Sequence, residues 1–326
     1  MMKQELSEVL QKHYQEAIKP DHKSSYRILS CGPPWLGAML SHITYCSLIS
    51  HQTGHDIHIS ANDSWRMMPG GRFTDCFQGL AAIDDSEFPL NNLDNPTYKF
   101  HYQDNGYANL NNFATEAIKY HYPPELIDIM GTTDTITLND IWKSFLLKRI
   151  YKLTPMLQTL VDHKVQALNI PEEYAAVHIR RGDKTAGPIA ESKAIPVGQY
   201  FACCRYTGYK NVFVSTDSPE VLTECYDLFG NEFNIMHDES EIRNDGYPYK
   251  IQKGIIKENP FTVMDELITG LKNIHILSHS SYLIGTKASW FFRISQLLRD
   301  YDKISAHAQA EAVDNIPGYP HHYCFC

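Results

Sequence analysis

The chain contains 326 residues, of which 43% are hydrophobic and 21% charged, so it can bury large apolar cores and is not a disordered polymer. Its 38 acidic residues outnumber its 29 basic residues and give a formal net charge of −9. This balance argues against a general nucleic-acid binder and against binding to anionic membranes. An anionic ligand therefore requires a local basic site.

The sequence predicts neither a membrane span nor a secretion signal. Its most apolar stretch, residues 31–49, is interrupted by two prolines and a histidine, and the first 25 residues are polar. The eight cysteines show no CxxC spacing. We expect a soluble, cytoplasmic protein with reduced thiols.

The first half of the chain begins with the element order of an α/β domain. Seven asparagines within residues 91–112 indicate a long polar loop, either solvated or part of a binding surface. Helical and alternating apolar patterns define the elements around it. The expected elements are a helix over 3–18, a strand over 26–30, a glycine- and proline-containing loop over 31–37, a helix over 38–50, a strand over 56–60, and helices over 138–147 and 156–168.

The second half alternates strands and helices, which is typical of a parallel sheet covered by helices. The expected strands are 174–179, 211–215, 233–236 and 281–285, and the expected helices are 196–205, 220–229, 261–271 and 289–299. We place a domain boundary near Pro171. The predicted organisation is an N-terminal helix over 1–25, α/β domains over 26–170 and 171–300, and a C-terminal tail over 301–326.

A local basic site follows the strand over 174–179. His178, Arg180, Arg181 and Lys184 lie where this buried strand ends, which is where ligands bind in doubly wound sheets. Arginine offers a planar set of donors suited to phosphate, and Asp183 either orients a cation or binds a sugar hydroxyl. The alternative is a solvated charged turn with internal ion pairs.

Two further strand ends carry polar residues. Asp217 and Ser218 follow the strand over 211–215, and Thr286 and Ser289 follow the strand over 281–285. These residues suit a ribose, a base or a phosphate, or they only cap the following helices. Three such sites along one sheet edge favour a ligand site. We expect no metal, because His55 and His58 have no third ligand placed with them, and the histidines and cysteines of residues 321–326 lie in a tail, which is usually mobile or packed.

The motif HIRRGDK at residues 178–184 resembles the HxRRxDK signature of the α1,6-fucosyltransferases and the bacterial NodZ-type fucosyltransferases. The resemblance spans about residues 26–300. Further segments resemble parts of that family in the same order, namely 37–46, 62–71, 213–219 and 274–289.

The resemblance implies a GT-B-like fold, in which two α/β domains face a cleft and the C-terminal one is Rossmann-like. It implies an acceptor-side domain over 26–170 and a nucleotide-sugar domain over 171–300. It also implies an inverting glycosyltransferase that moves L-fucose from GDP-fucose to a glycan hydroxyl without a metal. Transfer of another nucleotide sugar, or an inactive homologue that binds glycans or nucleotide, remains an alternative.

The resemblance also implies residue roles. Arg180 stabilises the leaving GDP phosphate, and either Glu191 or Asp183 is the base. Ser218 and Asn273 stand where the family has aspartates; at Asn273 a charge is lost but a hydrogen-bonding amide remains, so base recognition either persists or relaxes. The implied donor contacts are His178, Arg180, Arg181, Lys184, Asp217, Asn273 and Ser289.

Overall fold

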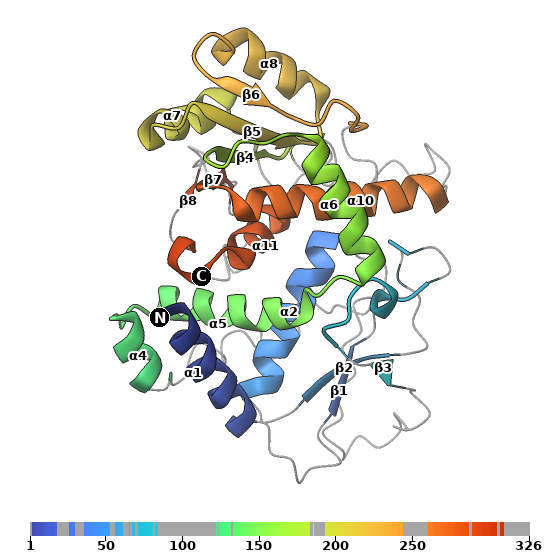
Figure 1. The fold of residues 1–326 in the computed structure, drawn as a ribbon, viewed down its shortest axis with the longest axis vertical. Helices are drawn as coiled ribbons and strands as arrows, with labels where there is room; N and C mark the ends of the chain where they lie inside the picture. Colours follow the sequence, from blue (N-terminus) through green and yellow to red (C-terminus); the bar gives the residue numbers. More distant parts are fainter. Residues whose placement is uncertain are drawn as a thin grey trace. The chain divides into compact units, whose positions relative to one another are not determined.

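Figure 1 shows the fold in a computed structural model. The asparagine-rich segment 91–112 lies outside the residues that the structure describes. The described residues are 2–17, 26–29, 36–52, 56–60, 65, 67–68, 71–80, 82–83, 122, 124–131, 133–182, 185, 193–243, 260–286, 289–304 and 307–309.

The chain divides into two compact units, Met1–Gln158 and Thr159–Phe325. The division falls within a helix, before the boundary expected near Pro171. Within the described ranges, no helix is both long and apolar enough to cross a membrane. The first unit contains α1 (Met2–Ala17), β1 (Tyr26–Leu29), α2 (Leu36–Gln52), β2 (Asp56–Ser60), η1 (Phe73–Asp75), β3 (Ala82–Ile83), α4 (Pro124–Met130), α5 (Thr135–Ile150) and the start of α6 (Pro155–Ala167).

The first unit has a three-stranded parallel sheet in the order β1-β2-β3. The predicted N-terminal helix and both predicted strands are confirmed. Leu6, Leu10 and Tyr14 of α1 are buried, since their spacing of four residues places them on one helical face. Arg149 of α5 lies over the ring of Tyr14, 3.9 Å from its centroid, which holds α1 against the unit.

The second unit contains a five-stranded parallel sheet with helices packed on both of its faces. Each predicted strand and helix of this half is present, and α10 extends beyond the expected end at residue 271. The elements are β4 (Ala175–Ile179), α7 (Val197–Thr207), β5 (Asn211–Thr216), α8 (Pro219–Phe229), β6 (Asn234–Met236), α10 (Pro260–His279), β7 (Tyr282–Gly285), α11 (Trp290–Leu298), η4 (Tyr301–Lys303) and β8 (His307–Gln309).

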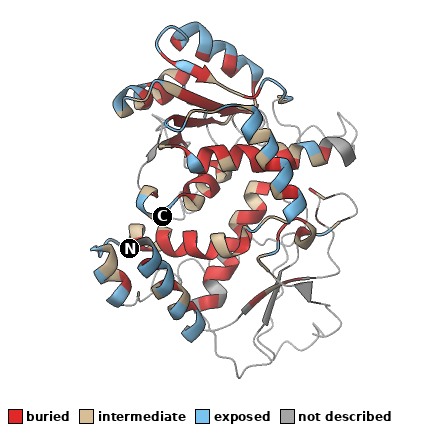
Figure 2. Ribbon diagram, viewed as in Figure 1, coloured by how far each residue is buried: buried red, intermediate tan, exposed pale blue. Residues whose placement is uncertain are grey.

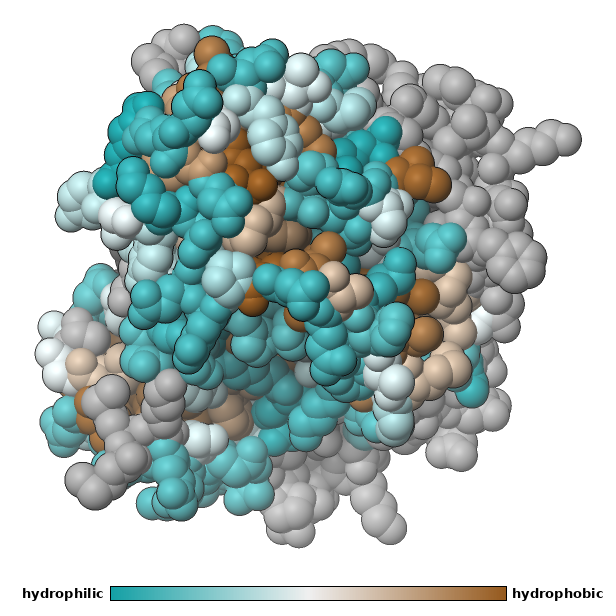
Figure 3. Space-filling model, turned by 45° about the horizontal axis from the view of Figure 1, so that its top comes forward, coloured by the Kyte–Doolittle hydropathy of each residue, from teal (hydrophilic) through white to brown (hydrophobic). Residues whose placement is uncertain are grey.

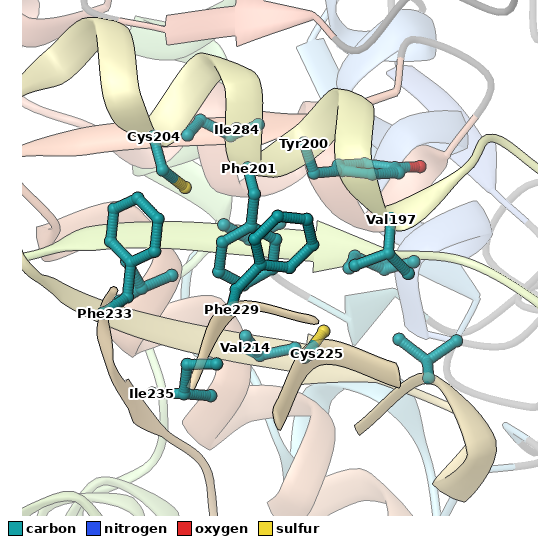
Figure 4. Close-up of a cluster of buried hydrophobic side chains, with 14 of the residues drawn as sticks. Val197, Tyr200, Phe201, Cys204, Val214, Cys225, Phe229, Phe233, Ile235 and Ile284 are labelled. Atoms are coloured by element: carbon teal, nitrogen blue, oxygen red, sulfur yellow. The ribbon is translucent and has the colours of Figure 1, made fainter. Parts of the chain in front are cut away.

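Alternate residues of each strand pack on opposite faces of this sheet. Val177 and Val214 join the core under α7 and α8, where the rings of Phe201 and Phe229 stack with centroids 4.4 Å apart (Figure 4). Ala176, Phe213 and Leu283 join a second core with Ile276 of α10 and Phe292 of α11. The central strands β4, β5 and β7 are therefore buried on both faces, and Figure 2 shows them mostly as buried residues.

The strand order is β6-β5-β4-β7-β8. It places the first strand of the sheet, β4, at the centre, with later strands added first on one side and then on the other. This is the Rossmann order, in which the strand order reverses between β4 and β7. Residues 307–309, within the expected tail, form the edge strand β8 on β7.

The described residues on the face shown in Figure 3 are mostly hydrophilic. On the face shown in Figure 3, hydrophobic residues form small groups among hydrophilic ones. Scattered apolar side chains on a surface are ordinary and indicate no interface by themselves. Among the described residues, the exposed large hydrophobic side chains are Met156, Leu160, Tyr206, Tyr226, Leu228 and Ile242.

Candidate active site

An arginine and an aspartate connect the ends of two neighbouring strands. Arg180 follows β4 and forms an ion pair with Asp217, which follows β5. The other carboxylate oxygen of Asp217 accepts the backbone N–H of Arg181, at 2.9 Å. Because β4 and β5 are parallel neighbours, their ends meet at one sheet edge, and Asp217 orients both the guanidinium and the loop that follows β4.

The two adjacent arginines have different surroundings. The Arg181 guanidinium donates to the carbonyl oxygen of Ile195 at 2.5 Å and interacts with Tyr200 of α7. It is therefore engaged with the protein on the α7 face of the sheet. Neighbouring residues of an extended chain point to opposite faces, so Arg180 is directed toward the α10 face.

A histidine and a serine bridge the point where the strand order reverses. His178 Nε2 lies 2.8 Å from Ser289 Oγ, and the His178 ring stacks on Phe291 with centroids 5.2 Å apart. Burial, followed by the nearby charge of Arg180, lowers the pKa of His178 to about 3. The imidazole is therefore neutral at physiological pH. Ser289 also caps α11 by accepting the N–H of Phe292, at 3.4 Å.

A buried polar cluster follows β6. Lys272 of α10 is 0% exposed and forms ion pairs with Asp238 and Glu241, the second at 3.6 Å. Glu241 Oε1 accepts a hydrogen bond from Asn273 Nδ2 at 2.9 Å, and Glu241 Oε2 accepts one from Arg243 at 3.1 Å. Each charged group meets an opposite charge, which is the condition for burying such groups.

Glu266, also on α10, is a partly buried carboxyl near these groups. Burial, with the charges of Glu241 and Asp265, raises the pKa of Glu266 to about 7, while Arg180 acts in the opposite direction. Glu266 is therefore close enough to Arg180, Asp217 and the cluster after β6 for their charges to shift its pKa. A carboxyl that titrates near neutrality is common at functional sites.

Several predicted site residues lie outside the described part of the chain, namely Asp183, Lys184 and Glu191. The contacts above bring five of the others to one sheet edge: His178, Arg180, Arg181, Asp217 and Ser289. Asn273 of α10 instead contacts Glu241, in the segment that follows β6.

Ser218 occupies the N-cap position of α8, but its hydroxyl accepts no backbone N–H of the helix and instead donates to the side-chain Oε2 of Glu220 at 2.7 Å. The sequence analysis missed Glu241 and Glu266. Glu241 lies in an irregular segment and Glu266 in an amphipathic helix, and neither setting indicates from the sequence that folding will bury an acidic side chain.

No group of three histidine, cysteine, aspartate or glutamate side chains suited to a metal occurs in the part of the chain that the structure describes. The site is instead a set of donors and acceptors held at fixed positions. An oriented strand-end arginine is suited to stabilise negative charge that develops on an oxygen during a reaction.

Comparisons with known proteins identify the family. The model for alpha-(1,6)-fucosyltransferase N- and catalytic domains matches residues 1–317. A search of curated protein sequences finds no match.

Among solved structures, the chain is similar to fucosyltransferase NodZ from Bradyrhizobium, with 15% identity and a TM-score of 0.50 over 85% of this chain and 93% of that one. The same values apply to NodZ alpha-1,6-fucosyltransferase soaked with GDP-fucose. It is also similar to a mutant of Arabidopsis thaliana FUT1 in complex with GDP, with 13% identity and a TM-score of 0.50 over 88% of this chain and 72% of that one.

These structural likenesses confirm the expected fold class, an α/β fold of the GT-B type with a Rossmann-like C-terminal unit. Because the family model spans almost the whole sequence, the chain belongs to the α1,6-fucosyltransferase family and is a glycosyltransferase.

Proposed function

We propose that this enzyme transfers L-fucose from GDP-fucose to a hydroxyl of a glycan acceptor, with inversion at the anomeric carbon. The observation that carries the proposal is Arg180, held by Asp217 at the sheet edge beside the His178–Ser289 pair. A NodZ relative of the same fold was soaked with GDP-fucose, and the plant relative contains GDP, which supports the same donor here.

In this mechanism the bond between the fucose anomeric carbon and the β-phosphate oxygen breaks, and the electron pair remains on GDP. The Arg180 guanidinium stabilises this negative charge, and Asp217 keeps the guanidinium in place. Removal of one preorganised donor of this kind lowers the rate by roughly 10²- to 10³-fold. Arg180 would supply the positive charge that a metal supplies in other transferases, so no metal is required.

The acceptor hydroxyl attacks from the opposite face of the sugar and loses its proton to a base. Glu191 or Asp183 takes this role in the proposal. The second unit holds the donor through the residues predicted for it, and the first unit holds the acceptor.

The test measures GDP release from GDP-fucose with and without a panel of glycans, in parallel with other nucleotide sugars. Arg180→Ala is compared with Arg205→Ala, because Arg205 forms an exposed ion pair with Glu232 on the surface of the same unit. We expect release that increases with one acceptor, falls by roughly 10²-fold or more in Arg180→Ala, and is retained in Arg205→Ala.

Two results would overturn the proposal. Turnover of a different nucleotide sugar but not of GDP-fucose would show another donor. GDP binding without turnover of any donor across the acceptor panel would favour an inactive homologue, a reading that the replacement of acidic residues by Ser218 and Asn273 supports.

A further inference from the structure

The cluster after β6 fixes the orientation of one amide. Asn273 is 4% exposed, and its Nδ2 donates to Glu241 Oε1 at 2.9 Å. Its Oδ1 has no hydrogen-bond partner among the described residues. A buried acceptor without a partner is unusual and calls for an explanation, and a ligand that arrives with a donor is one.

Glu241 stabilises the orientation of the Asn273 amide in which Nδ2 faces the carboxylate. An ionised carboxylate only accepts hydrogen bonds, so it holds the amide nitrogen of Asn273 and turns the oxygen away. Burial raises the pKa of Glu241, and the adjacent cations Lys272 and Arg243 act against this. Arg243 Nη2 lies 3.1 Å and Lys272 Nζ 3.6 Å from Glu241 Oε2, and this attraction favours the ionised form.

We propose that Glu241 is a positioning residue that fixes Asn273 as a hydrogen-bond acceptor for the nucleotide base and thereby selects guanine. The inference rests on the proposed function, since it concerns the base of the same donor. Asn273 alone could present either a donor or an acceptor; with Glu241 ionised beside it, the amide presents only its oxygen.

The chemistry of the bases explains why an acceptor favours guanine. Guanine offers adjacent N1–H and N2–H₂ donors, and one amide oxygen with two lone pairs accepts from both. Adenine places the N1 acceptor where guanine has N1–H, so two acceptors would face each other. Inosine diphosphate lacks the N2 amino group and loses one of the two hydrogen bonds. A contact of this kind contributes roughly 10- to 100-fold in discrimination.

The experiment measures the affinities of GDP, inosine diphosphate and ADP by calorimetry for the wild type, E241Q, N273D and E241Q/N273D. A glutamine at position 241 can donate to Asn273 Oδ1, so the amide is no longer held with only its nitrogen facing position 241. We expect E241Q to lose roughly 10- to 100-fold in GDP affinity and most of the preference for GDP over ADP. E239Q is the matched control, because Glu239 is exposed in the same loop, and it should behave as the wild type.

The double variant separates positioning from structural support. In E241Q/N273D the glutamine donates to an aspartate that still presents an acceptor, and the charge of the cluster is unchanged, so the GDP preference should return. If E241Q does not fold, the double variant carries the test, and loss of its GDP-over-ADP ratio overturns the inference.

Equal losses for all three nucleotides in E241Q would also overturn the inference, since they indicate a structural role. A wild type that turns over GDP-fucose but shows no preference for GDP over ADP would overturn the inference alone. A wild type that binds no GDP would overturn the proposed function itself.

Discussion

The carboxyl of Glu266 makes the stability of the protein depend on pH in a direction that can be calculated. Its pKa is raised to about 7 from an ordinary value of 4.5, with burial as the largest cause. Between these two values the unfolded chain releases this proton while the folded chain retains it. The free energy of unfolding therefore falls as the pH rises through this window, and the loss is complete above about pH 7.

The Glu266→Gln variant removes this dependence, because glutamine has a similar shape and no proton to release. Each pKa unit corresponds to about 1.4 kcal/mol, so the variant should gain up to about 3 kcal/mol relative to the wild type between about pH 4.5 and about pH 8. The charge of Arg180, which lowers the pKa of Glu266, is already included in the value of about 7.

Urea unfolding at about pH 5 and about pH 8, without nucleotide, measures the difference between Glu266→Gln and the wild type at each pH. Asp265→Asn is the matched control, since Asp265 is an exposed acidic neighbour on the same helix. It should show a much smaller pH-dependent difference. A difference for Glu266→Gln that is the same at both pH values would refute the reasoning and show that this carboxyl ionises normally.

Three more predictions concern the second unit. Phe201→Ala removes a fully buried ring that stacks on Phe229, and should lower the free energy of unfolding by about 3–5 kcal/mol in urea titrations; a loss below about 1 kcal/mol would contradict the packing described. Gly285→Ala places a Cβ 2.1 Å from a ring carbon of Phe292, and should destabilise by about 1–3 kcal/mol in thermal melts, whereas an unchanged Tm would show that the ring moves freely. His178, with a pKa near 3, should show no titration of its ring signals by NMR between about pH 5 and about pH 8, and a midpoint near 6.5 would mean that the ring is solvated.

The sheet of the second unit was predictable because its strands have simple hydrophobicity patterns. The strands over 174–179 and 211–215 are apolar runs bounded by turn residues, and buried parallel strands have this pattern. Polar residues directly after such runs predicted the sheet edge at which Arg180 and Asp217 meet.

The end of α10 and its polar contacts were not predictable in the same way. Lys272 and Asn273 look like the solvated end of a helix, yet both are buried, because Asp238 and Glu241 reach them from a loop more than thirty residues earlier. Glu266 likewise sits in an ordinary amphipathic pattern. Tertiary packing decides which polar residues become buried, and the spacing of apolar residues along the sequence does not predict it.

The short strand β8 has a consequence for self-association. It pairs with β7 from Leu283↔His307 to Gly285↔Gln309, so it covers the backbone edge that β7 would otherwise expose. A chain that stopped near residue 300 would keep every residue of the predicted signature but leave β7 as an open edge. Open edges of this kind recruit strands from other molecules. The three residues of β8 become the outer edge themselves, and an edge this short gives another chain little to pair with, so we expect a fragment without β8 to self-associate more readily.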